Sequence, residues 1–117
     1  MSFRFPKTQH LRKAPDIRKV LASGRKIGAD GFVIKWLPRT ENAEESRICV
    51  TVRKKEVKAA VKRNRIRRLV KEFFRHYSSK LIAPVDLVVQ VSFYKALKYK
   101  EIENFFKTNL KRAKLLS

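Results

Sequence analysis

One run of residues, from Lys62 to Tyr77, constrains the fold of this chain more than any other stretch. Its apolar residues recur at the spacing of a single helical face: Ile66, Leu69, Val70, Phe73, Phe74 and Tyr77. Its polar residues gather on the other side: Asn64, Arg68, Lys71 and Arg75, flanked by Arg63, Arg65 and Arg67. The spacing predicts a helix over about 59–78 that packs on one side and presents cations on the other.

The basic side of this helix carries more charge than solubility requires. Between positions 62 and 75, seven Lys and Arg residues stand against one acid, Glu72, and five of the seven are arginines. The whole chain has 30 Lys and Arg against 10 Asp and Glu, a formal charge of +20. Because guanidinium groups suit bidentate contact with phosphate, we expect a nucleic acid as the partner. A membrane is not expected, since the apolar residues form core-type patterns and no interfacial helix.

Cysteine content and apolar runs indicate the compartment and the size of the domain. The single cysteine, Cys49, cannot form a disulfide within the chain, which fits a reducing environment. No stretch is long and apolar enough for a secretory signal or a membrane span. We therefore expect a soluble, cytoplasmic protein, with 117 residues forming a single nucleic-acid-binding domain over 1–117.

The chain before the basic helix is expected to hold an arm, a helix and two or three strands. Residues 1–13 form a basic arm, of a kind that often stays mobile until bound. A helix is predicted over about 15–23, because Pro15 and Asp16 suit its first turn; Gly24 is expected to end it, and Gly28 and Gly31 to form the following turn. Alternation predicts strands over 31–37 and 47–53, which are expected to pair as antiparallel neighbours. The loop between them carries Glu41, Glu44 and Glu45, and is interpreted as a solvated turn and not as a metal site.

The chain after the basic helix contributes one more strand and one more helix. Residues 86–93 are almost continuously apolar, which is typical of a central strand covered on both faces. An amphipathic helix is predicted over about 100–115 from the spacing of Ile102, Phe105, Phe106 and Leu110. The expected order is α-β-β-(β)-α-β-α, and the fold class is α+β.

The sequence lacks the groups that would let the chain cut RNA by itself. Hydrolysis would need carboxylates around a magnesium ion, or a histidine pair for acid and base work. His10 and His76 are interpreted as surface residues, Cys49 as a core residue, and Asp16 and Asp86 as charges at the starts of elements. No catalytic residue is predicted in this chain.

A second basic surface is predicted beside the sheet. Lys35 lies on a strand face, Arg12 and Lys13 end the arm, and Arg53, Lys54 and Lys55 follow a strand. Grooves that follow a single nucleic-acid strand combine cations with flat apolar surfaces. The strand face between the first helix and the basic helix is the candidate groove.

Two consecutive motifs resemble those of the bacterial ribonuclease P protein component. The first is Arg-Ile-Cys-Val-Thr-Val-Arg-Lys-Lys over 47–55, and the second is Ala-Val-Lys-Arg-Asn-Arg-Ile-Arg-Arg-Leu-Val-Lys-Glu-Phe-Phe-Arg over 60–75. The family signature is the Arg-Asn-Arg tripeptide, here Arg63, Asn64 and Arg65. The resemblance extends to Leu11-Arg12-Lys13, Asp16, Gly24, 32–34 and 86–89, nearly the whole chain.

The resemblance implies a fold and a role. The fold would be a two-layer α/β sandwich similar to domain two of ribosomal protein S5, with a left-handed β-α-β crossover where parallel strands usually cross right-handed. The role would be that of an accessory subunit that binds the catalytic ribonuclease P RNA and precursor tRNA, with no DNA partner. The RNA would hold the catalytic Mg²⁺ and remove the 5′ leader, and the protein would bind no cofactor tightly.

The resemblance also implies two sets of site residues. The catalytic RNA would meet Lys54, Lys55, Lys62, Arg63, Asn64, Arg65, Arg67, Arg68 and Lys71. A cleft for the single-stranded leader would be lined by Arg12, Lys13, Ile17, Leu21, Val33, Lys35, Thr51 and Arg53. Ile17, Leu21 and Lys35 stand where the family often has aromatic residues, so charge contact with the leader backbone is expected to substitute for stacking, and the glycine-free loop 56–59 is one residue longer than usual. Two alternatives stay open: a structural RNA-binding protein such as a ribosomal one, and a self-sufficient nuclease.

Overall fold

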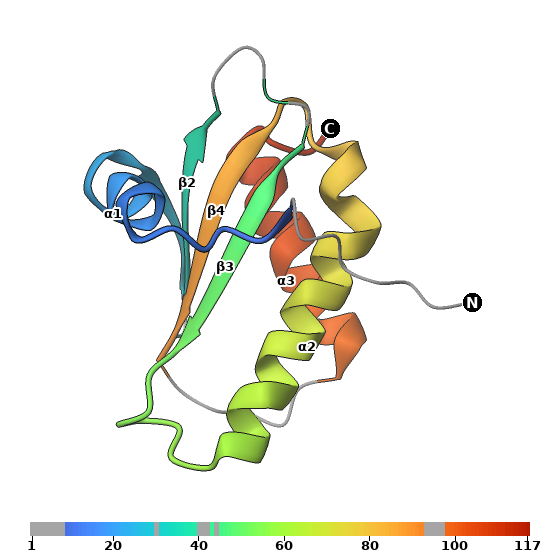
Figure 1. Ribbon diagram of the computed structural model, residues 1–117. Coiled ribbons are helices and arrows are strands. Elements are labelled where there is room, and N and C mark those ends of the chain that lie inside the picture. The colour runs from blue at the N-terminus through green and yellow to red at the C-terminus, as the bar shows by residue number, and fades with distance from the viewer. Residues whose placement is uncertain (1–8, 30, 40–42, 44, 93–97) are drawn as a thin grey trace.

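The computed structural model describes residues 9–29, 31–39, 43, 45–92 and 98–117. The elements follow one another along the chain (Figure 1) as α1 (Ala14–Ser23), β1 (Arg25–Ala29), β2 (Phe32–Pro38), β3 (Arg47–Val52), α2 (Ala60–Tyr77), a 3-10 turn (Ser78–Lys80), β4 (Val85–Val91) and α3 (Tyr99–Arg112). Helices and a mixed sheet make this an α+β fold, as predicted. Residues 1–8 of the basic arm, Glu41, Glu44 and Phe93 lie outside the described residues.

The four strands form one sheet in the order β1-β2-β4-β3. β4 lies in its middle, antiparallel to β2 and parallel to β3, and only one of its seven residues, Gln90, is not buried. The prediction of a central strand there is confirmed. The expected antiparallel pairing of the second and third strands is wrong, because β4 lies between β2 and β3.

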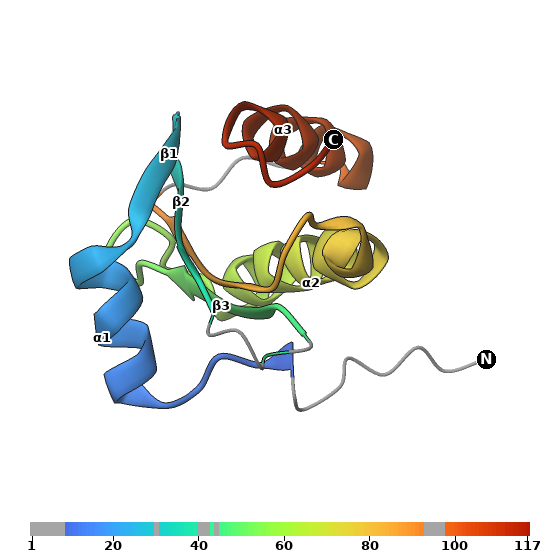
Figure 2. The same ribbon diagram turned by 90° about the horizontal axis from the view of Figure 1, so that it is seen from above.

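The helices cover the two faces of the sheet unequally. Figure 2 shows α1 on one face and both α2 and α3 on the other. The chain leaves β3, runs back through α2 and enters the parallel neighbour β4, and Figure 1 and Figure 2 together show this crossover to be left-handed. This is the rare hand for such a unit, and the family resemblance predicted it.

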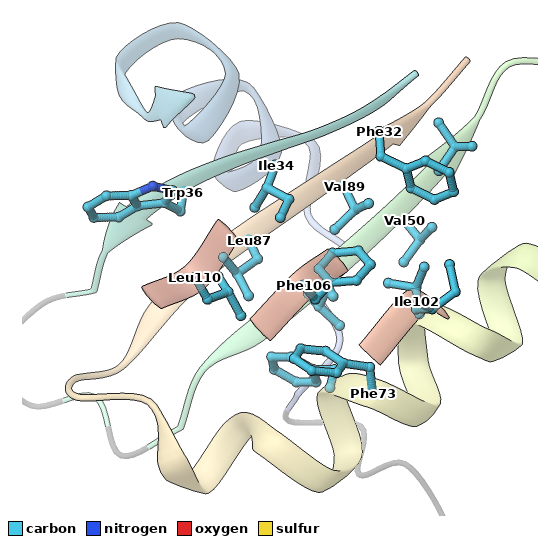
Figure 3. Close-up of a cluster of buried hydrophobic side chains, with 14 of the residues drawn as sticks. Phe32, Ile34, Trp36, Val50, Phe73, Leu87, Val89, Ile102, Phe106 and Leu110 are labelled. Atoms are coloured by element: carbon cyan, nitrogen blue, oxygen red, sulfur yellow. The ribbon is translucent and has the colours of Figure 1, made fainter. Parts of the chain in front are cut away.

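The main core lies between the sheet and the layer of α2 and α3. Figure 3 shows side chains from three strands, such as Ile34, Val50 and Val89, meeting Phe73 of α2 and Phe106 of α3. The rings of Phe73 and Phe106 stack with their centroids 5.2 Å apart. All five side chains are buried, so the apolar stripe predicted for the basic helix is the face that anchors it.

Two glycines at the start of the sheet serve purposes that the sequence did not reveal. β1 occupies the stretch that was predicted as a turn, and Gly28 lies inside this strand with a φ of +130°, which favours glycine. Gly24 does end α1, but with an extended backbone. A Cβ atom at Gly24 would lie 2.4 Å from the Val20 carbonyl oxygen and 2.9 Å from that of Trp36. Gly24 therefore permits the close approach of α1 to β2.

We expect Gly24→Ala to lower the free energy of unfolding by about 2 kcal/mol, because the new methyl group would press on backbone atoms that can move only with their elements. Chemical denaturation of the purified protein measures the change. Ser23→Ala, one residue earlier at an exposed position, is the matched control and should stay close to the parent. Equal stability of the two variants would contradict this explanation of Gly24.

Candidate nucleic-acid interface

The outward face of α2 is a continuous basic surface. Lys62, Asn64, Arg65 and Arg68 are exposed, whereas Arg63, Arg67 and Lys71 are half-buried along its margins. Val61, which is 80% exposed, and Leu69 add apolar area to a shallow hollow that also contains Asn64, Arg65 and Arg68. The seven polar residues predicted on this helix are therefore brought to one accessible surface, which combines charge with flat apolar patches.

The N-terminal end of α2 adds to this positive field. Its N-cap is Ala59, no side chain caps it, and its first turn contains no acid. The free N–H groups of a helix start carry partial positive charge, which acidic or capping side chains usually offset. Here cations follow instead, at Lys62 and Arg63. The beginning of α2 is suited to an anionic partner.

The loop between β3 and α2 is fixed against the start of the helix. The Arg63 guanidinium donates hydrogen bonds to the carbonyl oxygens of Val57, at 3.0 Å, and Lys58, at 2.8 Å. Val57 is buried in the main core, while Lys54 and Lys55 remain exposed. Arg63 therefore has an internal role besides its predicted contact with RNA, and it keeps the two lysines close to the basic face.

The other face of the sheet is only partly covered by α1. Val20 of α1 packs with Leu11 and Val88 in a second small core, and Ile17 leans against this cluster. Leu21 is 37% exposed, and Arg12 and Lys13 are exposed just before the helix. Ile17 is therefore partly buried where α1 packs on the sheet, whereas Leu21, Arg12 and Lys13 remain accessible to a ligand.

The uncovered part of this face holds the remaining predicted cleft residues. β2 contributes Val33 and Lys35, both half-buried, and β3 contributes the exposed Thr51. Arg53 follows at the end of β3, with a side chain that is 65% exposed and lies 3.4 Å from the carboxylate of Glu56. α2 lies on the opposite face of the sheet (Figure 2), so the predicted groove between the two helices is in fact an open sheet face bounded by α1 and the β3 end.

A charged network that the sequence did not reveal anchors α1. Arg47 of β3 donates two hydrogen bonds to Asp86 of β4, at 2.8 and 2.7 Å, and its guanidinium lies 3.5 Å from Asp16 of α1. The Arg39 guanidinium also lies 3.6 Å from the Asp86 carboxylate. The hydrogen bond to Asp86 raises the pKa of Arg47, although burial opposes it. Asp16 and Asp86 were interpreted as charges at element starts, and the structure joins them through Arg47.

The candidate catalytic groups among the described residues lie apart from one another. In the described part of the chain, no three His, Cys, Asp or Glu side chains come together as a metal site would require. His76 lies 3.0 Å from Glu72 on its own helix, and His10 forms an isolated β-bridge with Ile48. Cys49 is half-buried beside α1, and burial raises the pKa of its thiol while Lys71 and Arg67 oppose the shift. No helix among the described residues is long and apolar enough to cross a membrane.

Comparison with known proteins identifies the family. The family model for ribonuclease P matches residues 5–114. Relatives named ribonuclease P protein component include one from Desulfatibacillum aliphaticivorans, 41% identical over 75% of this chain and 72% of its own length. Another, from Clostridioides difficile, is 32% identical over 92% of this chain and 94% of its own.

Solved structures show the same fold. The ribonuclease P protein of Staphylococcus aureus superimposes with a TM-score of 0.76 over 93% of this chain and 98% of its own, at 23% identity. That of Thermotoga maritima gives a TM-score of 0.70 over 88% of this chain and 96% of its own, at 22% identity. Together with the basic helix and its Arg-Asn-Arg sequence, the family match over nearly the whole chain shows that this protein belongs to the ribonuclease P protein component family.

Proposed function

We propose that this chain is the protein subunit of ribonuclease P and assists the removal of the 5′ leader from precursor tRNA. In this proposal α2 binds the catalytic RNA, the open sheet face beside α1 receives the leader, and the RNA holds the Mg²⁺ that activates water. The observation that carries the proposal is the exposed basic face of α2, with an uncapped N-terminus and an apolar side that is buried in the core.

The contribution of the protein to the reaction is electrostatic. Two RNAs that approach each other repel through their phosphates, and a protein with a formal charge of +20 reduces that repulsion. Lys54 and Lys55 lie in the loop between the β3 end and α2, where the two proposed surfaces meet. A bridging position of this kind lets one side of the protein hold the ribozyme while another side holds the substrate.

Reconstitution with the catalytic RNA tests this function against both alternatives. We expect the protein alone to leave precursor tRNA intact, and its addition to the catalytic RNA to lower the magnesium concentration needed for cleavage. Cleavage by the protein without RNA would establish a self-sufficient nuclease. Binding of RNA without any change in the magnesium requirement would favour a structural RNA-binding protein.

Binding should also depend steeply on salt. If about five basic residues meet single-stranded phosphates, the logarithm of the affinity should fall against that of salt concentration with a slope of roughly 3 to 4. Titration of labelled leader-bearing precursor tRNA into the holoenzyme at several salt concentrations measures the slope. A slope near zero would contradict phosphate contact as the main source of affinity.

A further inference from the structure

Two lysines stand directly opposite each other on neighbouring strands of the open sheet face. Lys26 of β1 and Lys35 of β2 are register partners in an antiparallel pair, so their side chains project from the same face. Phe32, Ile34 and Trp36 of β2 point into the main core, which places Lys35 and its partner on the α1 side. Like charges in this position repel each other and destabilise a sheet.

Nothing in the described part of the chain neutralises this pair. Acids ion-pair with Arg39, Arg47, Arg53, Arg75 and His76, whereas neither Lys26 nor Lys35 has an ion-pair partner among the described residues. Charge on an edge strand can serve to block sheet-to-sheet aggregation, and this would explain Lys26. It does not explain Lys35, which lies on an inner strand and is half-buried.

The surface next to the lysine pair is flat and uncharged. The neighbouring row of register partners consists of Gly28, Val33, Gln90 and Thr51, from one edge of the sheet to the other. Beyond Thr51 the next cation is Arg53, directly after the end of β3. From Lys35 to Arg53 the path spans two strand spacings and four residues, roughly 16 Å. The row Gly28, Val33, Gln90 and Thr51 thus forms an open strip with cations at both ends, Lys26 and Lys35 at one and Arg53 at the other.

Among the described residues, none contributes an aromatic ring to the strip on which a base could stack. Every Phe, Tyr and Trp side chain that the structure describes belongs to the main core or packs against it, on the α2 and α3 side: Phe32, Trp36, Phe73, Phe74, Tyr77, Tyr99, Phe105 and Phe106. Surfaces that bind bases of single strands without sequence preference rely on such rings, and those that bind the backbone rely on cations. The described residues of this face include cations that could bind the backbone, but no aromatic ring that could bind a base.

We propose that Lys26 and Lys35 form a phosphate-binding pair that holds the backbone of the single-stranded leader, which then crosses the strip toward Arg53. The inference rests on the proposed function and adds to it Lys26 and its pairing with Lys35. The bound phosphate relieves the repulsion between the two ammonium groups. The strip selects for a flexible, negatively charged strand and not for particular bases.

The test compares Lys26→Gln/Lys35→Gln with the parent in reconstituted holoenzyme. We expect the affinity for precursor tRNA with a long leader to fall about tenfold, as for two lost surface charge contacts, and the affinity for tRNA without a leader to stay unchanged. The salt slope for the leader-bearing substrate should fall by about 1.4. Lys100→Gln/Lys111→Gln, the same charge change at two exposed positions of α3, is the matched control and should bind like the parent.

Chemically altered leaders separate phosphate contact from base contact. A leader with uncharged methylphosphonate linkages should bind the parent weakly, and the affinity difference between the parent and Lys26→Gln/Lys35→Gln should be much smaller on this leader than on the natural one. A leader with abasic sites should bind the parent normally. An abasic leader that loses as much affinity as the variant does, or a variant that binds the natural leader like the parent, would overturn the proposal. The thermal midpoint of the variant should equal or exceed that of the parent, because a repulsion is removed.

Failure of this inference differs from failure of the proposed function. If the parent protein gives no gain in affinity for leader-bearing over leaderless substrate when combined with the catalytic RNA, leader binding itself is wrong. If the parent gives that gain and Lys26→Gln/Lys35→Gln retains it, the leader contacts other residues.

Discussion

Arg65→Ala/Arg68→Ala should weaken binding of the protein to the catalytic RNA about a hundredfold while leaving its stability nearly unchanged. Both side chains are exposed on the outward face of α2 and border the same shallow hollow. A hydrogen bond to a charged group contributes about 1.5 kcal/mol, and loss of two gives roughly this factor. Titration of labelled catalytic RNA gives the affinity, and thermal melting gives the stability.

A matched control separates a specific interface from general charge. Lys111→Ala/Arg112→Ala removes the same amount of charge from the last turn of α3, where both side chains are exposed. We expect this control variant to bind the catalytic RNA less than fivefold more weakly than the parent, because it loses only long-range attraction. A similar loss in both double variants would mean that the RNA responds only to net charge. A loss of cooperative melting in Arg65→Ala/Arg68→Ala would mean that this face of α2 supports the fold.

Replacement of the same residues with lysine tests the geometry of the contact. Lysine keeps the charge but lacks the planar fork that binds phosphate through two donors. We therefore expect Arg65→Lys/Arg68→Lys to recover only part of the affinity, with a salt slope close to that of the parent. Full recovery would show that charge alone is sufficient at these positions.

The sequence predicted the elements whose signal is local. α2 was located within one residue at each end, because its apolar residues recur along a single helix and its basic residues fill the opposite side. β4 was recognised from its continuous apolar run, since a strand that is buried on both faces has no polar side. Both signals lie within the segment itself and do not depend on what the segment meets.

Pairing between strands was not predictable in the same way. β3 and β2 are consecutive in the chain, yet β4, which comes after α2, separates them. β1 contains a glycine and is short, so its composition is that of a turn, and only its pairing with β2 makes it a strand. The position of the open sheet face, and the opposition of Lys26 and Lys35 on it, follow from these pairings and not from any local pattern.

The charged network around Arg47 was missed for the same reason. Its two acids come from α1 and β4, and 70 positions of sequence separate Asp16 from Asp86. Each acid could be explained locally, as a charge at the start of its own element. A signal was nevertheless present, because an aspartate in a central strand whose other residues, except Gln90, are apolar must find a partner when it is buried. The sequence could have indicated that a partner exists, but several arginines were equally suitable.

Loss of Asp86 should lower the free energy of unfolding by about 3 kcal/mol, because Arg47 would keep its charge in a largely buried position. The side chains of Asp86 and Arg47 are only 12% and 22% exposed, and two direct hydrogen bonds join them. In Asp86→Ala, Arg47 retains only the longer contact with Asp16, whose side chain is 38% exposed. Denaturant titration measures the loss, and the thermal midpoint should fall by about 10 °C.

Two further variants show whether the cost is that of an unpaired charge. Asp16→Asn removes the exposed partner and should cost less than about 1 kcal/mol. Arg47→Met/Asp86→Leu replaces both charges with apolar groups of similar length and should recover much of the stability lost in Asp86→Ala. If Arg47→Met/Asp86→Leu is as unstable as Asp86→Ala, the network contributes directed hydrogen bonds that packing cannot replace.

Because Arg47 also holds α1 through Asp16, Asp16→Asn should weaken leader binding more than it weakens assembly with the catalytic RNA, which depends on α2.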